Sequence, residues 1–184
     1  MKTIELIGVA GPAGSGKDTV ADFICSERGY IKYSLAAPMK AAVNGMLAAA
    51  GCEVINFNDR KVKEARHSLL GCSPRRFLQL FGTDFARNMI NDSIWLNHAN
   101  HFINKQSARG YGIVVPDIRY PNESSWLRER GGKLIHVIRP GVGAVEAHIS
   151  EAGVEVVDGD IVVINDGSLN TLFSKVRDGL GAAA

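Results

Sequence analysis

The clearest chemical signal in the sequence is a run of glycines that ends in one lysine, within residues 8–19. Gly11, Gly14 and Gly16 can adopt positive φ angles, which lets successive backbone N–H groups approach a polyphosphate closely. Lys17 completes the spacing G-x-x-x-x-G-K and supplies a cation for the same phosphates. The segment therefore predicts a P-loop, which is a backbone cradle for the phosphates of a nucleoside triphosphate.

The residues after this lysine decide where a metal ion could bind. A P-loop usually continues with Ser or Thr as a Mg²⁺ ligand, but this chain has Asp18 there and Thr19 one step later. Because Mg²⁺ keeps several of its waters in protein sites, we expect Asp18 and Thr19 to hold it directly or through water. The residues expected to bind the triphosphate are Gly11, Ala13, Gly14, Ser15, Gly16, Lys17, Asp18 and Thr19.

Several cations stand near predicted strand ends or in the segment between residues 36 and 110. A protein that transfers a phosphoryl group mainly positions donor and acceptor and spreads positive charge around the moving group. The candidate cations are Lys17, Lys40, Arg66, Arg75, Arg76, Arg87, Arg119 and Arg139. Asp117 could bind a Mg²⁺-bound water, accept a hydrogen bond from a substrate hydroxyl, or act as a general base. An alcohol acceptor needs such a base, whereas a phosphate acceptor is already anionic at neutral pH.

One predicted helix has two faces that differ in kind. Ser73 and Pro74 form a cap-plus-proline start for a helix from Arg75 to about Ile90. An apolar stripe with a spacing of four residues predicts its core face: Phe77, Phe81, Phe85 and Met89. Another face carries cations, amides and a hydroxyl without a carboxylate: Arg76, Gln79, Thr83, Arg87 and Asn91. That face could line an anion site or be a solvated surface.

The elements that position these residues alternate between apolar strands and helices. Strands are predicted at residues 4–9, 30–35, 111–115, 133–138 and 160–164, and the third is expected to be broken by Pro116 and to end at Asp117. Such alternation predicts a parallel sheet with helices on both faces. Ligands bind at the carboxyl ends of the strands in these sheets, so the P-loop, Asp117, Arg119 and Arg139 should meet at one edge.

Length, charge and cysteine content disfavour several classes of protein. The 184 residues suffice for one domain with its own core. With 21 basic and 19 acidic side chains, the net charge of +2 is too small for a general binder of nucleic acid or membranes. The three cysteines lack zinc spacing and indicate reduced thiols, and no segment resembles a signal peptide or reaches the ~20 apolar residues of a membrane span. A cytoplasmic protein with a small anionic ligand is expected.

A P-loop alone does not choose between kinases, switches and motors. The sequence contains no N-K-x-D motif for guanine recognition, and the strand end at residues 114–117 lacks the Asp-Glu pair of water-activating ATPases. Both absences disfavour a GTPase switch and a motor. A kinase with a phosphate acceptor, a kinase of a small metabolite with an alcohol acceptor, and a non-catalytic nucleotide-binding protein remain.

Segments along most of the chain resemble the phage-type deoxynucleoside monophosphate kinase family, within the P-loop nucleoside monophosphate kinases. They are GKDT at 16–19, APMK at 37–40, RFLQLFGT from 76 through Arg87, IW at 94–95, DIRYPNE at 117–123, VIRP at 137–140 and HISE at 148–151. The resemblance implies a three-layer α/β/α P-loop NTPase fold with about five parallel strands. It also implies a single kinase domain over residues 1–184, with a helical monophosphate-binding insert at about 36–110 and a short lid at about 141–157.

The activity implied by the resemblance is phosphorylation of a deoxynucleoside monophosphate (dNMP) to the diphosphate (dNDP) with ATP and Mg²⁺. Lys17, Arg139 and Asp117 would be the catalytic residues. The acceptor would contact Lys40, Arg76, Gln79, Arg87, Trp95, Asp117 and Arg119. Trp95 could stack on a base or pack in the core. The expected partners are small molecules, with no nucleic acid polymer and no membrane, in the cytoplasm of a host cell if the gene is phage-encoded; a homodimer is left open.

Two further interpretations concern the region after residue 127. The predicted lid contains no Arg or Lys, so its cations would have to come from its edges, at Arg128, Arg130 or Arg139. Aspartates flank the last predicted strand and are interpreted as turn residues: Asp158, Asp160 and Asp166.

Overall fold

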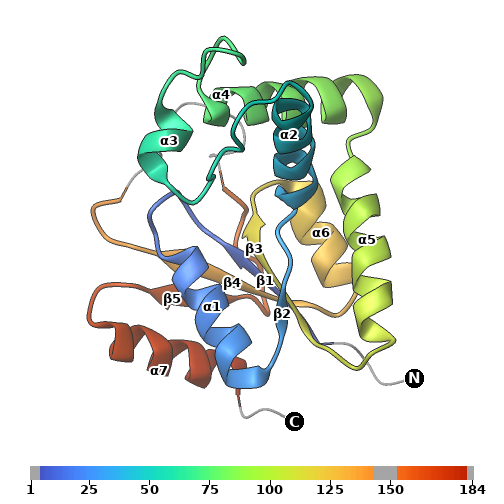
Figure 1. The fold of residues 1–184 in the computed structure, drawn as a ribbon. Coiled ribbons are helices and arrows are strands. Elements are labelled where there is room, and N and C mark those ends of the chain that lie inside the picture. The colour runs from blue at the N-terminus through green and yellow to red at the C-terminus, as the bar shows by residue number, and fades with distance from the viewer. Residues whose placement is uncertain (1–4, 143–152, 182–184) are drawn as a thin grey trace. The chain divides into compact units, whose positions relative to one another are not determined.

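The computed structural model describes residues 5–142 and 153–181, and Figure 1 shows its ribbon. The chain forms two compact units. Unit 1 comprises Met1–Leu35 and Ala99–Ala184, and unit 2 comprises Ala36–His98. Most of the predicted lid at 141–157 lies outside the described residues.

Unit 1 is built on a five-stranded parallel sheet, as predicted. Its strands are β1 (Leu6–Ala10), β2 (Ile31–Lys32), β3 (Ile113–Ile118), β4 (Lys133–Ile138) and β5 (Ile161–Ile164). The strand order is β2-β3-β1-β4-β5, so β1 lies in the centre between β3 and β4. The second strand is shorter than predicted and ends before Tyr33, whose N–H still donates to Val114 O at 2.8 Å. The carboxyl ends of β3, β1 and β4 therefore lie side by side.

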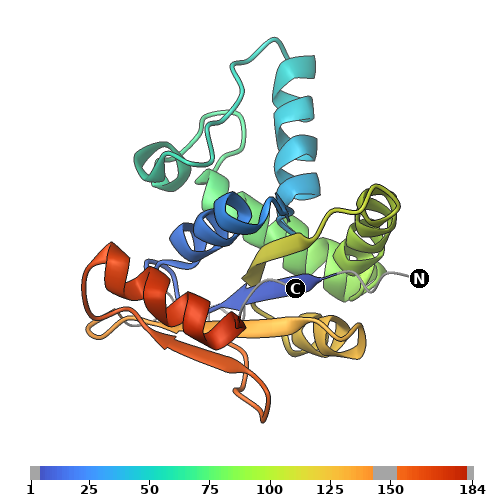
Figure 2. The ribbon, with the colours of Figure 1, turned by 90° about the horizontal axis from the view of Figure 1, so that it is seen from below.

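Helices cover both faces of this sheet (Figure 2). Those of unit 1 are α1 (Lys17–Arg28), α6 (Pro121–Glu129), α7 (Leu169–Leu180) and the later part of α5 (Ile94–Ser107). Val20 of α1 and Leu172 of α7 join one apolar core on the first face, where each buried aliphatic side chain contributes about 1.5–3 kcal/mol. On the other face α6 lies close to β1 because Gly8 has no side chain; a Cβ there would stand 2.6 Å from Leu127 Cδ2. Unit 1 is therefore a three-layer α/β/α structure.

Strand β3 differs from its prediction at Pro116. The strand continues through this proline to Ile118 instead of being broken there. Gly8 pairs with Val115 and Ala10 with Ile118, so two steps along β1 match three steps along β3. Such a bulge tolerates proline, which has no N–H to donate to the ladder. The prediction of a break failed because proline interrupts a regular ladder, whereas here it lies in an irregular part of β3 together with Asp117.

Unit 2 is helical. Its elements are α2 (Ala37–Ala49), α3 (Arg60–Glu64), α4 (Pro74–Gln79), the π-helix η1 (Leu80–Ile90) and the first turn of α5. The predicted cap is confirmed, because Ser73 Oγ accepts a hydrogen bond from Arg76 N at 3.2 Å. A small core of buried residues holds the unit together: Val43, Leu47, Ile55 and Phe57. Asn44 fastens the loop after α2 to the helix, since its side chain exchanges two hydrogen bonds with the backbone of Ile55.

The apolar stripe predicted for the helix at 75–90 is wrong in its second half. Phe85 is 47% exposed and Met89 is 75% exposed, whereas Thr83 and Arg87 are only 8% exposed. The reason is the wide turn of η1, in which Asn91 N donates to Ala86 O five residues earlier. The buried residues of η1 are Gly82, Thr83, Ala86 and Arg87. The predicted polar face is therefore buried at Thr83 and Arg87 but exposed at Arg76 and Asn91.

Candidate active site

The P-loop takes its shape from glycines with backbone angles that other residues rarely adopt. The φ angles are 139° at Gly11, 82° at Gly14 and 105° at Gly16. A Cβ on Gly11 would also collide with the carbonyl oxygen of Val137 in β4, and one on Gly16 would stand 2.7 Å from Asn165 Nδ2. The loop therefore needs glycine both for its φ angles and for close contact with β4 and the segment after β5.

Helix α1 begins at the end of this loop, at Lys17. The N–H groups of its first turn lack intrahelical acceptors and carry the positive end of the helix dipole, which favours an anion. Lys17 is 8% exposed, and its Nζ donates to Pro12 O at 2.6 Å. Ser15 is fully buried, and its Oγ has no hydrogen-bond partner among residues 5–142 and 153–181. The arrangement can bind a polyphosphate through backbone donors and one lysine.

A residue that the sequence prediction missed, Asn165, holds the loop in place. Its Nδ2 donates to Ser15 O at 2.9 Å, and its own N–H donates to Ile138 O at 2.7 Å. Next to it lies a pocket lined by Arg139, Pro140, Asn165, Asp166 and Gly167. The sequence did contain a signal, because Asn165 directly follows an apolar strand at the edge of the sheet where ligands bind.

Asp117 lies in the bulge of β3 and contacts the segment after β2. Its Oδ2 accepts a hydrogen bond from Ser34 Oγ at 2.6 Å, and its Oδ1 accepts one from Leu35 N at 2.9 Å. Burial raises the pKa of the neighbouring Tyr33 hydroxyl to about 12, and the negative charge of Asp117 adds to the shift. The carboxylate thus already serves two donors within unit 1.

The segment that carries Arg119 is held by a buried carboxylate. Glu123 is 2% exposed, and its Oε2 accepts hydrogen bonds from Arg119 N at 2.7 Å and Tyr120 N at 3.1 Å. Because Glu123 lies in the first turn of α6, its charge is also favoured by the helix dipole. The backbone from which the Arg119 side chain leaves is therefore well fixed.

The other predicted acceptor residues belong to unit 2. Lys40 lies on α2, Arg76 and Gln79 on α4, and Arg87 on η1. Arg87 Nη1 donates to Asp92 O at 3.3 Å. The first turn of α2 packs against η1, since Met39 Sδ occupies the space that a side chain on Gly82 would need. Within unit 2 the helices that carry these polar side chains are thus in contact.

Trp95 is a core residue in this structure. Its side chain is 7% exposed, and its Nε1 donates to Gly82 O at 2.9 Å. The centroid of its ring lies 6.2 Å from that of Phe81. Of the two roles expected for Trp95, these contacts correspond to packing in the core.

The residues proposed for Mg²⁺ fit a metal that is bound chiefly through phosphates. Asp18 is exposed in the first turn of α1 and Thr19 follows it, half-buried. Among the described residues no group of three or more His, Cys, Asp or Glu side chains could hold a metal ion. Mg²⁺ needs no such group when substrate phosphates and water supply most of its ligands. The hydroxyl and the carboxylate at this helix start are suitable oxygen donors for the remainder.

The structure thus distributes the predicted site residues over the two units. Unit 1 carries the P-loop, Asp117, Arg119 and Arg139, at or after the adjacent ends of β1, β3 and β4. Unit 2 carries the remaining predicted acceptor residues: Lys40, Arg76, Gln79, Arg87 and Trp95.

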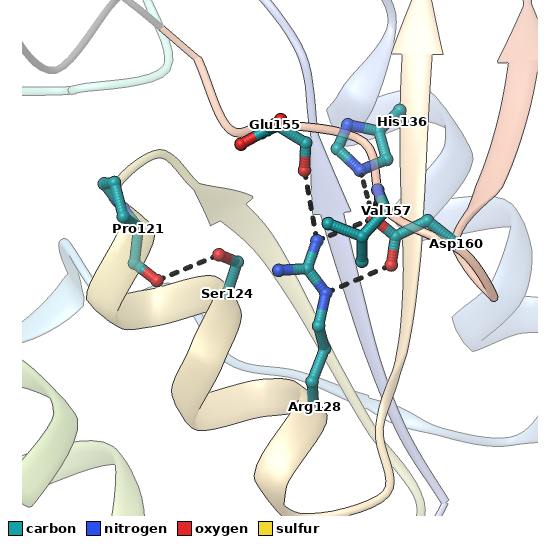
Figure 3. Close-up of polar contacts among 7 residues, drawn as sticks. All are labelled: Pro121, Ser124, Arg128, His136, Glu155, Val157 and Asp160. Carbon is teal, nitrogen blue, oxygen red and sulfur yellow. Dashed lines mark hydrogen bonds and ion pairs between the residues drawn. The ribbon is translucent and has the colours of Figure 1, made fainter.

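A separate polar cluster joins α6, β4 and the segment before β5 (Figure 3). Asp160 accepts hydrogen bonds from Arg128 Nη2 at 2.6 Å, Arg128 Nε at 3.2 Å and Val157 N at 3.1 Å, and pairs with His136 Nε2 at 2.9 Å. Burial alone would raise the pKa of Asp160, but the bonds from Arg128, His136 and the Val157 amide hold it below its usual range. Asp160 is therefore the centre of a buried network rather than the simple turn residue that the sequence suggested.

Two cations expected at the edges of the lid have partners in unit 1, and Arg128 Nη2 also contacts the predicted lid itself by donating to Glu155 O at 3.2 Å. Arg128 belongs to the cluster around Asp160, and the Arg130 guanidinium lies 5.1 Å from the ring centroid of Trp126. Arg139 follows β4 and lines the pocket beside Asn165. Of the three, Arg139 is the one next to the P-loop region.

The sheet order, the loop after β1 and the helices on both faces define a P-loop protein of the three-layer α/β/α class. The fold is similar to that of a sugar kinase from Janibacter, with a TM-score of 0.54 and 15% identity over 96% of this chain and 94% of the other. No helix in the described part of the chain is both long and apolar enough to cross a membrane.

The particular family follows from the sequence comparison. The profile of the family described as deoxynucleotide monophosphate kinase matches residues 5–67 and 47–176. The deoxynucleotide monophosphate kinase of Enterobacteria phage T4 is 30% identical over 96% of this chain and 99% of its own length. The enzyme of the same name from Escherichia phage RB69 is 28% identical over 95% and 98%. The chain belongs to the deoxynucleotide monophosphate kinase family.

Proposed function

We propose that this protein transfers the γ-phosphoryl group of ATP to the phosphate of a dNMP and releases ADP and a dNDP. The observation that carries the proposal is the P-loop of unit 1, with its positive-φ glycines and Lys17, in a chain of this family. The two relatives named above are deoxynucleotide monophosphate kinases, and this chain aligns with almost the whole length of each.

The donor binds unit 1. The N–H groups of residues 13–19 contact the β- and γ-phosphates, and Lys17 neutralises charge on them. Arg139 follows β4 and lines the pocket beside Asn165, so it is the cation we assign to the triphosphate or the transferred group. The same pocket is continuous with the P-loop through the bond from Asn165 to Ser15, and we assign it to the base of the donor. Mg²⁺ would be held by Thr19 and Asp18, and its positive charge would neutralise the phosphate oxygens.

The acceptor binds side chains of unit 2, which we propose to be the monophosphate-binding insert. Lys40, Arg76 and Arg87 offer cations, and Gln79 offers an amide that can both donate and accept. Arg87 suits a phosphate because a planar guanidinium binds two oxygens at once. Arg119 of unit 1 is assigned to the same substrate.

The chemical step needs no strong general base. The attacking atom is an oxygen of the dNMP phosphate, which is already anionic at neutral pH. Bond formation to this oxygen and cleavage of the bond to the β-phosphate leave ADP, with charge spread over the three oxygens of the moving group. Lys17 and Arg139 stabilise that charge, and the protein supplies position and electrostatics. The substrates are small anions, in keeping with the nearly balanced net charge of +2.

A coupled assay of ADP release tests the proposal directly. The wild-type protein is incubated with ATP, Mg²⁺ and one of dAMP, dGMP, dCMP, dTMP, the matching ribonucleotides or a set of metabolite alcohols. We expect release that depends on at least one dNMP. Release only with an alcohol would indicate a metabolite kinase, and ATP binding without acceptor-dependent release would indicate a binding protein; either result contradicts the proposal.

A further inference from the structure

The chain passes between the two units at two places. The first passage runs from Leu35 to Ala36, directly after the short strand β2. The second runs from His98 to Ala99 and lies inside the continuous helix α5. Any residue that fixes these passages to unit 1 also fixes where the chain enters and leaves the unit that carries the proposed acceptor side chains.

The first passage is held by β3 and by Asp117. Tyr33 N donates to Val114 O at 2.8 Å, Ser34 Oγ donates to Asp117 Oδ2 at 2.6 Å, and Leu35 N donates to Asp117 Oδ1 at 2.9 Å. The Leu35 side chain is 2% exposed. Three consecutive residues before the boundary are thus bound to one strand, and two of them are bound by one carboxylate.

The second passage is held in the same unit and is joined to the first. Trp126 Nε1 of α6 donates to Asn100 Oδ1 at 2.8 Å, within two residues of the boundary. The Tyr33 ring stacks on Phe102 of α5 with ring centroids 4.4 Å apart. The two passages are therefore held by the same part of unit 1 and contact each other there. Asp117 is the charged residue that binds the first passage.

We infer that Asp117 is a positioning residue, which fixes the chain where it enters the acceptor-binding unit and takes no proton from the acceptor. The inference rests on the proposed function. Both carboxylate oxygens accept hydrogen bonds from the first passage, and the phosphate acceptor needs no base. The bulge contains Asp117, because the extra residue of β3 lies between Val115 and Ile118, and a bulge changes the direction in which a side chain leaves its strand.

Three variants separate this role from that of a base: Asp117→Ala, Asp117→Asn and Ser34→Ala. Asp117→Ala should raise the KM for the dNMP by about tenfold or more, since hydrogen bonds to a charged group are lost, and should change the KM for ATP little. Asp117→Asn keeps an oxygen for Leu35 N–H and an amide that can donate to Ser34 Oγ, so it should recover most of that loss. Ser34→Ala should act in the same direction as Asp117→Ala but more weakly, and should add nothing in the double variant.

The inference is overturned if Asp117→Asn is as inactive as Asp117→Ala, with the loss in kcat and with the acidic limb of the pH profile removed. It is also overturned if Asp117→Ala raises the KM for ATP as much as that for the dNMP.

Hydrogen exchange tests whether Asp117 holds the first passage even if no acceptor is phosphorylated, so this inference and the proposed function can fail separately. We expect the Leu35 amide to exchange slowly in the wild type and in Asp117→Asn, and about tenfold or more faster in Asp117→Ala. Equal exchange in all three proteins contradicts the inference. Thermal unfolding of each variant shows whether a loss reflects unit 1 as a whole, and Ser34→Ala remains informative if Asp117→Ala does not fold.

Discussion

Unit 1 and unit 2 hold their functional groups in different ways. In unit 1 the groups that we propose to bind the donor are mainly backbone N–H groups, and their positions follow from glycine φ angles, the contact of Gly11 with β4 and the bond from Asn165 to Ser15. In unit 2 the candidate groups are long side chains on helices around a small core. That unit also exposes large apolar residues, among them Phe85 and Met89.

This difference explains how one chain can bind two different substrates. A backbone cradle binds the phosphates that all nucleoside triphosphates share, and no single side-chain change can remove its donors. Side chains on helices can be exchanged without altering the fold, so they suit the recognition of one particular acceptor. We therefore expect variants of the P-loop and of Asn165 to change donor binding. Variants of unit 2, and of Asp117 and Arg119 in unit 1, should change acceptor binding.

The largest effect is expected from Lys17→Ala. This change removes the P-loop cation that we assign to the transferred group, and loss of one such stabilising group lowers kcat by about 10²–10³-fold. ADP release in the presence of a dNMP measures the loss. The exposed Lys105 on α5 offers a matched control, because Lys105→Ala removes the same charge away from the loop. Normal turnover in Lys17→Ala would refute the assignment of the donor to this loop.

A large loss of stability is expected from Asp160→Ala. The change leaves Arg128 without its buried carboxylate, and breaking such a pair costs about 3–5 kcal/mol of unfolding free energy. Chemical denaturation measures the effect, with Asp178→Ala on the exposed side of α7 as the control. Equal stability of the two variants would show that unit 1 does not depend on this cluster.

The same cluster predicts a dependence of stability on pH. Because the pKa of Asp160 is lower in the folded protein, its contribution is complete above the ordinary Asp value of about 3.9 and is lost as the pH falls from there through the folded value. The stability difference between wild type and Asp160→Ala should therefore shrink below about pH 4. Denaturation curves at pH 7 and at several acidic pH values measure it, and a constant difference would contradict the role of the charge.

A smaller effect is expected from Asn165→Ala, which frees the carbonyl of Ser15. The P-loop keeps its glycines but loses a tie to β5, so the KM for ATP should rise by about tenfold, which corresponds to one hydrogen bond of about 1.4 kcal/mol. Steady-state kinetics with varied ATP measure this change, with the exposed Asn104→Ala as the control. An unchanged KM for ATP would mean that the loop is held without Asn165.

The smallest effect is expected from Gly45→Ala in α2. No atom lies within 4 Å of a Cβ there and Gly45 has no positive φ angle, so alanine should stabilise the helix by about 0.5–1 kcal/mol. Gly16→Ala is the opposing case, because its φ of 105° and the contact with Asn165 forbid a side chain. Denaturation should show a gain for the first variant and a loss for the second. A loss of stability in both variants would contradict the expectation that only Gly16 is required to be glycine.

The parts of the fold that sequence reasoning predicted are those with local signals. Each of these signals lies within a few consecutive residues. The structure contains the P-loop glycines, the Ser73 cap and the apolar strand β4. Pro116 and Phe85 were misjudged because the rules for regular strands and α-helices do not apply at a bulge or in a π-helix.

The parts of the site that were missed depend on contacts between distant residues. Asn165 is separated by 150 positions from Ser15, whose carbonyl it binds, and Asp160 by 32 from Arg128. Nothing near either residue in the sequence specifies its partner. The hydrogen-bond donors of Asp117, Ser34 and Leu35, likewise lie 83 and 82 residues earlier, so the sequence does not reveal the contacts on which its inferred positioning role rests.

Two-substrate kinetics of one variant from each unit test the central claim most directly. Asn165→Ala alters the donor loop, and Lys40→Met removes a charge from unit 2 while keeping most of the side-chain length. We predict that the first variant raises the KM for ATP alone, that the second raises the KM for the dNMP alone, and that the double variant combines both changes. A rise of both KM values in either single variant would contradict the assignment of the donor to the P-loop region and of the acceptor to the side chains of unit 2.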